Sequence, residues 1–333
     1  MKNCTLLITL LLIVSACMIG TPDWTSEVPI SCDDISREIT WLDIPTDSLN
    51  APMAIVKAGE KIIIADVTQN FALKIFDCND KTLTRCLNVG RASTEVLSVN
   101  QMFLYKEYLS VVDNLSKKML FLDLKDYTIS TTYDIEDYST VAVVNDTLVG
   151  TLLSSNARYG KAPLDSIHNT LRFMDYSEYG LSNSLGSGLL QGHVLANENS
   201  RLSWFGYYSS IYQTIDYDKE IVIKSRILEE SSFNNHGQSY ATLKPESKIA
   251  FISVDGNNKH IYVLYDGKEL LHYMNNRGQK PYGNTILRLD WNGDMITRYN
   301  SSLPITCLHE ESDKLYLCIL TKEGHYKIGY YNL

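Results

Sequence analysis

A short apolar segment that ends in aspartate recurs along this chain, and this recurrence constrains the fold more than any other feature. The copies are separated by roughly 40 to 75 residues, a period typical of propellers and solenoids, in which each unit buries its face against its neighbours. They are Lys74–Asp77, Leu120–Asp123, Arg172–Asp175, Gln213–Asp216 and Arg288–Asp290, and a related strand, Ile328–Tyr331, closes the chain. We expect each segment to be the third strand of a repeated unit.

A second apolar strand precedes each of these segments. The second strands are Lys61–Ala65, Tyr108–Val112, Thr147–Thr151, Leu202–Gly206, His260–Leu264 and Lys314–Cys318. The last unit reaches Leu333 before its fourth strand, and Arg37–Ile44 can supply that strand from the other end of the chain. Such a pairing removes a sheet edge. The pattern therefore predicts an all-β protein, a six-bladed β-propeller closed by an N-terminal strand that completes the last blade.

The N-terminus has the pattern of a secretory signal. Met1-Lys2-Asn3 is a short positive start, and the apolar run Leu6–Val14 is shorter than a membrane-spanning helix. Val14-Ser15-Ala16-Cys17 resembles the lipobox of bacterial lipoproteins, although an ordinary secretory signal with a nearby cysteine is the alternative. We predict a lipoprotein signal peptide over residues 1–16, a lipidated tether over 17–34 that starts at Cys17, and the propeller over 35–333.

The charge of the chain excludes one class of partner. The formal net charge is −9 at pH 7, and an acidic body lacks the basic footprint that nonspecific nucleic-acid binding requires. No segment after the signal reaches membrane-spanning length. We therefore expect no nucleic-acid partner and expect the membrane to be reached through the N-terminal lipid.

Two cysteines are expected to face each other. Cys17 aside, five cysteines follow the predicted cleavage site, an odd number that excludes a complete disulfide framework. Taking Ser312-Asp313 as a hairpin turn places Cys307 opposite Cys318. A disulfide and a pair of packed thiols are both compatible with that position.

The recurring aspartates have two interpretations. Each stands where the third strand turns into the fourth, where a carboxylate can accept hydrogen bonds from nearby backbone amides. Asp290, Asn292 and Asp294 also match the start of an EF-hand loop, but the closing position holds Ser301 where the motif has glutamate. Turn capping is favoured, and we predict no metal site.

Candidate binding residues are expected on one loop-rich face. Two long loops between second and third strands, residues 154–168 and 268–284, carry arginine, glycine, lysine and proline in the same order. With the segments that link one blade to the next, they bring together charged and aromatic side chains suited to a carboxylated sugar or a peptide terminus. These are Arg91, Glu95, Arg158, Tyr159, Lys161, His193, His236, Arg277, Lys280 and Tyr282. Pairing of the arginines with surface acids is the alternative for any single residue.

Catalytic signatures are lacking in the sequence. The chain has no Gly-x-Ser-x-Gly elbow, no His-Glu-x-x-His helix and no phosphate-binding loop, and its histidines have no metal-ligand spacing. We therefore assign no catalytic residue and no cofactor.

Several of these features together resemble a known family, the TolB-like six-bladed propeller lipoproteins of Gram-negative bacteria. The resemblance rests on the lipobox at Cys17, the stretch Gly90–Glu95, the strand Ile261–Tyr265 and the hairpin Leu289–Gly293. It implies a six-bladed propeller on a lipid anchor and supplies no established activity. Ala92 and Ser93 depart from the glycine and proline that are common in the family.

Two hypotheses about function follow. The first is a non-catalytic binding or scaffold lipoprotein of the cell envelope, anchored in the outer membrane, whose loop-rich face holds a glycan, peptide or protein. The second is a hydrolase or lyase that acts on a glycan or peptide at the central channel, which requires acids or histidines to converge at the channel mouth. The first is favoured because a fold by itself cannot carry a reaction.

Overall fold

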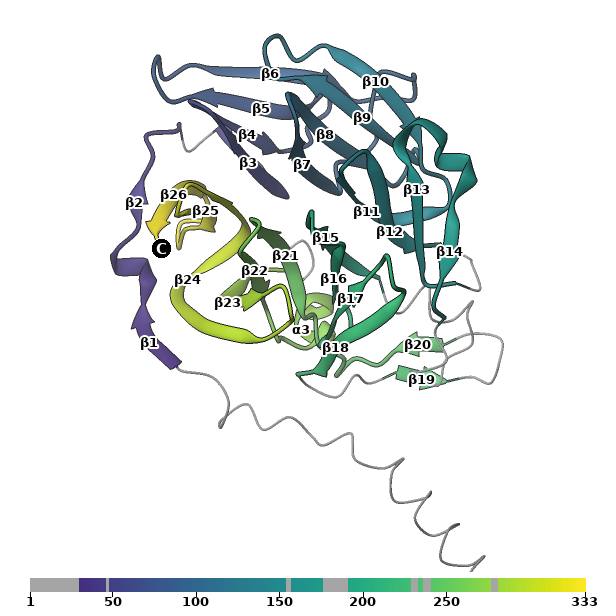
Figure 1. Cartoon of the computed structure of the whole chain (residues 1–333). Helices are drawn as coiled ribbons and strands as arrows, with labels where there is room; N and C mark the ends of the chain where they lie inside the picture. Colours follow the sequence, from purple (N-terminus) through teal and green to yellow (C-terminus); the bar gives the residue numbers. More distant parts are fainter. Residues whose placement is uncertain are drawn as a thin grey trace, which may run out of the picture.

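The chain folds into antiparallel sheets arranged around a common centre (Figure 1). The structure is a computed structural model that describes residues 30–45, 48–153, 157–175, 191–228, 233–235, 241–276 and 281–333. Within these ranges, helices are limited to short segments such as the 3-10 turn η1 (Ile35–Arg37) and α3 (Leu270–Asn275). None of the described helices has the length and apolar character needed to cross a bilayer. The predicted all-β class is confirmed.

Four sheets in the described part have four strands each, in chain order from the centre outward. The first is β3 (Ala54–Ala58), β4 (Lys61–Ala65), β5 (Phe71–Asp77) and β6 (Leu83–Asn88). The second is β7 (Gln101–Tyr105), β8 (Tyr108–Asp113), β9 (Lys118–Asp123) and β10 (Ile129–Asp134). The third is β11 (Tyr138–Val144), β12 (Thr147–Leu152), β13 (Tyr159–Pro163) and β14 (Leu171–Phe173). The fourth is β15 (Gly192–Ala196), β16 (Arg201–Gly206), β17 (Ile211–Asp216) and β18 (Ile221–Ile227).

A larger sheet contains two further groups of four strands that share one long strand. It consists of β21 (Phe251–Gly256), β22 (His260–Tyr265), β23 (Gly283–Asp290), β24 (Met295–Glu311), β25 (Lys314–Leu320), β26 (Tyr326–Asn332) and β2 (Thr40–Trp41). The first half of β24 pairs with β23 and its second half pairs with β25. β24 is therefore the outer strand of one group and the inner strand of the next. A separate hairpin joins β19 (Phe233–Asn235) to β20 (Ala241–Leu243).

The N-terminal segment adds a short strand, β2, to the edge of the last group. Thr40 and Trp41 lie opposite Tyr330 and Gly329, and the backbone N–H of Leu42 donates to the carbonyl of Ile328 at 2.9 Å. Before it, β1 (Ile30–Asp34) runs parallel to the outer half of β24. The last residues of the segment expected as a tether thus form a strand (Figure 1).

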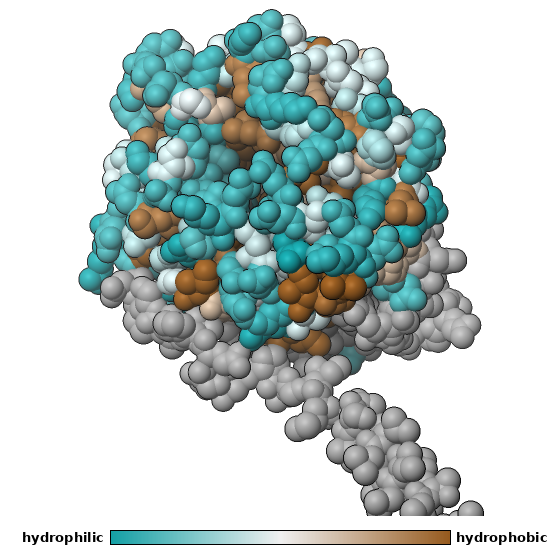
Figure 2. All heavy atoms as spheres, viewed as in Figure 1, coloured by the Kyte–Doolittle hydropathy of each residue, from teal (hydrophilic) through white to brown (hydrophobic). Residues whose placement is uncertain are grey.

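Apolar side chains fill the spaces between neighbouring sheets. Leu73 and Ile75 of β5, for example, pack with Leu109 of β8 and Leu120 of β9, and all four are at most 2 % exposed. The face shown in Figure 2 is mostly hydrophilic, with separated hydrophobic patches. Burial between sheets therefore supplies the main stabilising term of this fold.

The third sheet differs from the sequence-based assignment. We expected Arg172–Asp175 as its third strand and residues 154–168 as a loop, but Tyr159–Pro163 forms the third strand and residues 171–173 the fourth. The segment Tyr-Gly-Lys-Ala-Pro has no apolar run, so the pattern did not indicate a buried strand. A Cβ at Gly160 would lie 2.7 Å from the Thr170 side chain and 2.8 Å from the Leu152 side chain, so a larger residue would displace these neighbours.

The two cysteines of the last group lie where the hairpin prediction placed them. Cys307 of β24 and Cys318 of β25 are cross-strand partners, and both are fully buried. Of the two alternatives, a disulfide and a pair of packed thiols, the structure has the packed thiols. They pack with Ile62 and Phe76 of the first sheet and help to join the ends of the chain.

The aspartates at the ends of third strands cap turns. Asp77 Oδ1 accepts a hydrogen bond from the backbone N–H of Asn79 at 2.9 Å, and Asp123 Oδ1 accepts one from Lys125 at 2.8 Å. Asp290 Oδ1 accepts from both Asn292 and Asp294. The favoured interpretation of these residues is confirmed.

Candidate functional site

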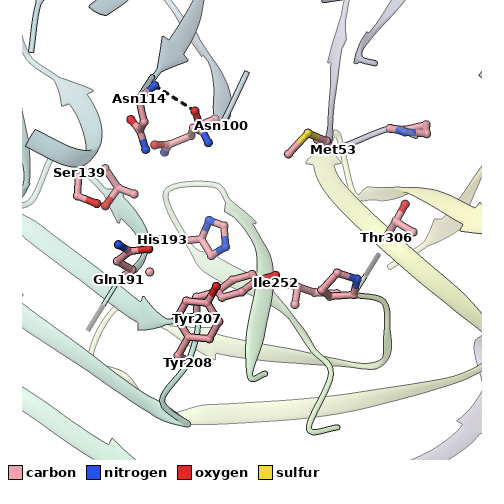
Figure 3. A pocket seen from close by; sticks show the side chains of 15 residues that line it. Met53, Asn100, Asn114, Ser139, Gln191, His193, Tyr207, Tyr208, Ile252 and Thr306 are labelled. Carbon is pink, nitrogen blue, oxygen red and sulfur yellow. Dashed lines mark hydrogen bonds between the residues drawn. The ribbon is translucent and has the colours of Figure 1, made fainter. Parts of the chain in front are cut away.

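A polar pocket lies at the centre of the molecule, where the inner strands of the sheets begin. Its volume is about 330 Å³. Each of the four-stranded sheets and both groups of the larger sheet contribute a residue that lies in the inner strand or directly before it: Met53, Gln101, Thr140, His193, Ile252 and Thr306. Met53, His193, Ile252 and Thr306 are labelled in Figure 3. The site thus depends on the assembly of sheets and on no single loop.

Amide side chains form one wall of the pocket. The backbone N–H of Asn114 donates to Asn100 Oδ1 at 3.0 Å, while the Asn114 Oδ1 atom is buried without a hydrogen-bond partner among the residues that the structure describes (Figure 3). Gln101 bridges three sheets, because its Nε2 donates to the carbonyl of Val194 and its Oε1 accepts from the N–H of Val141, both at 3.4 Å. A ligand donor aimed at Asn114 Oδ1 would satisfy an acceptor that folding leaves open.

Two tyrosines form the opposite wall (Figure 3). Tyr207 and Tyr208 lie in the turn between β16 and β17, and their ring centroids are 4.7 Å apart in an edge-to-face arrangement. The turn is held by the N–H of Tyr207, which donates to Gln191, and by the carbonyl of Tyr207, which accepts from Ala250. Burial raises the pKa of Tyr207 far above its usual value, so this phenol stays neutral. The pair offers a rigid aromatic surface with hydroxyl groups at its edge.

His193 lies between the two walls. A Cβ at the preceding residue, Gly192, would fall 2.1 Å from the Phe205 carbonyl oxygen, so glycine is needed for β15 to carry His193 into this position. The Nε2 atom of His193 is buried and has no hydrogen-bond partner among the described residues. Burial lowers the pKa of His193 to about 4, and a hydrogen bond to the Phe251 backbone opposes this effect only in part. The imidazole is therefore neutral at pH 7.

The depressed pKa of His193 predicts an acid-dependent loss of stability. The unfolded chain binds this proton near pH 6.5 and the folded chain near pH 4, so stability falls as pH decreases through 6.5 toward 4. Between pH 7.5 and 5, the wild type should lose about 2 kcal/mol more than His193→Asn, which lacks the titrating group. Urea unfolding of both proteins at the two pH values measures the difference. Equal losses would contradict burial of a neutral imidazole.

Three residues predicted for the binding face lie elsewhere. Arg158 and Tyr159 are at most 1 % exposed between the third and fourth sheets. The Arg158 guanidinium stacks 4.2 Å from the Trp204 ring centroid and donates to Gln213 Oε1, which also accepts from the Tyr159 hydroxyl at 2.8 Å. Lys161 Nζ donates to the carbonyl of Tyr217 at 2.7 Å. Their assignment to a solvent-facing loop was wrong, because this segment is strand β13 and its preceding residue.

The remaining predicted residues are divided between the surface and undescribed segments. Arg91 is exposed, and Glu95 accepts from the backbone of Ala92 at 3.0 Å. Tyr282 stacks with Lys268, whose Nζ lies 3.9 Å from the ring centroid. Of the seven predicted side chains that the structure describes, only His193 lines the central pocket. Cys17, His236, Arg277 and Lys280 lie outside the described residues.

Sequence reasoning missed most of the pocket. Asn100, Asn114, Thr140, Tyr208 and Thr306 belong to no motif and are neutral, so nothing in their local sequence indicates a site. One available signal was positional, since these residues stand at the starts of first strands or in turns after second strands.

The described lining carries no charged side chain other than the titratable His193. Asp, Glu, Lys and Arg do not occur among its fifteen residues. In the described part of the chain, no cluster of three histidine, cysteine, aspartate or glutamate side chains is arranged to hold a metal ion. The pocket is suited to a ligand whose polar groups are uncharged.

Comparison with known proteins supports the expected relationship. Residues 197–313 match the family model described as TolB-like 6-blade propeller-like. The predicted resemblance to TolB-like propellers is confirmed over these residues. A comparison with curated proteins gives no match.

Solved structures with a similar fold are distant in sequence. A Bacteroides fragilis protein, described provisionally as exported, has a TM-score of 0.59 and 11 % identity over 92 % of this chain and 99 % of its own. A catalytically inactive virginiamycin B lyase from Staphylococcus aureus, solved with quinupristin, has a TM-score of 0.51 and 12 % identity over 89 % and 99 %. At these identities the similarity shows the propeller fold alone.

Proposed function

We propose that this TolB-like chain is a lipid-anchored binding protein of the cell envelope that holds a neutral glycan in its central pocket. The signal at residues 1–16 and the lipobox cysteine Cys17 support the anchor. We place this anchor in the outer membrane, a location that the resemblance to envelope lipoproteins supports. Membrane fractionation of a Cys17→Ser variant tests this part, since an anchor at that cysteine predicts release of the protein.

The proposed architecture is a six-bladed ring closed by the N-terminal strand. The inner strands support this arrangement, because β3 contacts β7, β7 contacts β11, β11 contacts β15, β15 contacts β21, β21 contacts β24, and β24 contacts β3. The antiparallel pairing of β2 with β26 also supports closure, because it joins the N-terminal and C-terminal segments in one sheet. A closed ring holds the pocket walls at fixed positions, which favours binding without a large ordering cost.

The chemistry of the pocket favours a sugar over other ligands. Sugar hydroxyls both donate and accept, and the amides of Asn100, Asn114 and Gln191 present both donors and acceptors. A tyrosine ring such as Tyr208 gives an apolar face for the C–H side of a sugar ring. An anionic ligand would need a counter-charge that the described lining lacks.

The single observation that carries this proposal is a neutral polar lining contributed by all six groups of strands. We propose binding and no reaction, because His193 has no carboxylate beside it in the described lining with which to form an acid–base pair. The alternative of a hydrolase or lyase lacks this second group.

The proposal predicts selective binding on a glycan array. Wild-type protein should bind neutral oligosaccharides, and Tyr208→Ala should weaken that binding by about tenfold or more, because it removes the aromatic face on which a sugar ring would pack. Calorimetric titration with the best array ligand gives the dissociation constants.

Tyr282→Ala is the matched control, since it removes a tyrosine outside the pocket lining. It should bind like the wild type. Binding restricted to peptides, or equal loss in both variants, would contradict the proposed ligand class or the proposed site. Turnover of the bound glycan would overturn the non-catalytic assignment.

A further inference from the structure

A second cavity, which unlike the central pocket has positively charged side chains in its wall, lies on the first sheet. Its volume is about 260 Å³, and it is bounded by the turn between β4 and β5, by the connector before β3, and by β5 and β6. Lys74 and Arg85 lie in its wall together with amide and hydroxyl side chains that include Asn50, Thr68 and Asn70. Its described lining has no carboxylate.

The pairing register places two cations side by side in this cavity. Lys74 of β5 and Arg85 of β6 are direct cross-strand partners, so their side chains project from the same face of the sheet. Like charges in this relation destabilise a sheet unless they are compensated. A counter-charge beside either member relieves this repulsion.

Only one of the two charges is compensated within the described chain. Lys74 is 2 % exposed and forms an ion pair with Asp66, which is fully buried behind the cavity wall, and it also donates to the carbonyl of Ser48. Asp66 is held by the backbone N–H groups of Asn50 and Ala51, at 2.9 and 2.7 Å. Its carboxylate is thus committed to Lys74 and the backbone.

Arg85 supplies the remaining positive charge. Its side chain is exposed and makes no ion pair or hydrogen bond with any residue that the structure describes. The guanidinium presents several N–H donors in a planar fork, a geometry that matches the two oxygens of a carboxylate. The cavity therefore has an uncompensated single charge beside neutral donors and acceptors.

We propose that this cavity binds the carboxylate of an acidic sugar, with Arg85 as the recognition residue. One net positive charge matches a carboxylate better than a phosphate monoester, which carries about −1.5 to −2 at pH 7. The amide and hydroxyl groups of the wall suit the hydroxyls of a uronic acid ring.

The connector before β3 links the two cavities. Ser48 and Asn50 line the blade cavity, while Pro52 and Met53 line the central pocket. Both sites therefore open at the same end of the first sheet. The second site does not depend on the central pocket for any of its residues, so each can be tested separately.

The test is calorimetric titration of the folded chain with D-glucuronate, D-glucose and inorganic phosphate. Glucuronate should bind more tightly than either of the others. Arg85→Gln should weaken glucuronate binding by about tenfold or more, because it removes a charge-assisted pair of hydrogen bonds. Added salt should weaken the interaction as well.

Two variants separate this site from alternatives. Arg91→Gln removes an exposed arginine outside the cavity and should leave glucuronate binding unchanged, as should Tyr208→Ala in the central pocket. Circular dichroism confirms that each variant is folded. Equal affinities for glucuronate and glucose, tighter binding of phosphate, or an unaffected Arg85→Gln variant would each overturn the proposal.

Discussion

Removal of residues 30–44 will lower the free energy of unfolding by about 5 to 9 kcal/mol, which is close to the whole stability of a typical domain. This segment contributes three buried isoleucines, Ile35, Ile39 and Ile44, which are 1 %, 8 % and 7 % exposed. Burying one such side chain contributes about 1.5 to 3 kcal/mol. The truncation also exposes the edge of β26, which β2 covers.

The measurement compares chains that begin at residue 30 and at residue 45, by urea unfolding and by thermal melting. The shorter chain should be unfolded or should melt at a much lower temperature. A synthetic peptide of residues 30–44, added in excess, should raise its melting temperature in a concentration-dependent manner. Equal stability of the two chains would contradict the role of the N-terminal strand in the last group of strands.

Much of the fold could be predicted because buried strands leave a strong local signal. The second strands β4, β8 and β25 are apolar runs of five to seven residues, and each was expected within two residues of its observed ends. The pairing of β2 with β26 followed from counting strands. The prediction was wrong at β13, where Tyr159 and Ala162 are buried but Gly160 and Lys161 interrupt the apolar run.

The site was much less predictable, for two physical reasons. Charged loop residues were expected to face solvent, but Arg158 is buried because Trp204 and Gln213 of the neighbouring sheet accommodate its guanidinium. The pocket itself is made of neutral side chains such as Asn100 and Thr306, which are far apart in the sequence. Their proximity depends on the arrangement of the sheets and has no local signature.

The aspartates also differ in how well their roles could be predicted, because some bond to neighbours in the sequence and others to distant residues. Those at the ends of third strands cap turns two residues away, a local role that the sequence indicates. A second set, Asp66, Asp113 and Asp266, stands at or directly after the ends of second strands, and its side chains are fully buried. Asp113 accepts from the N–H of Leu97, sixteen residues away, so its role is visible only in the structure.

The two sets of aspartates should therefore differ sharply in their contribution to stability. Asp66→Ala leaves Lys74 buried without its carboxylate and removes the acceptor for two backbone N–H groups. Breaking a buried ion pair on one side costs about 3 to 5 kcal/mol. Asp77→Ala removes a turn cap near the surface and should cost about 1 kcal/mol.

Urea unfolding of the two variants and of Asp66→Leu/Lys74→Met distinguishes a buried charge from a lost contact. The double variant replaces both charges by apolar groups of similar size, and it should recover most of the stability that Asp66→Ala loses. A double variant no more stable than Asp66→Ala would assign the loss to the backbone hydrogen bonds of Asn50 and Ala51. If Asp66→Ala and Asp77→Ala lower the free energy of unfolding by similar amounts, the buried ion pair stabilises the fold no more than a turn cap does. That result would contradict the prediction, which rests on the position of Asp66 between β4 and the connector that lines both cavities.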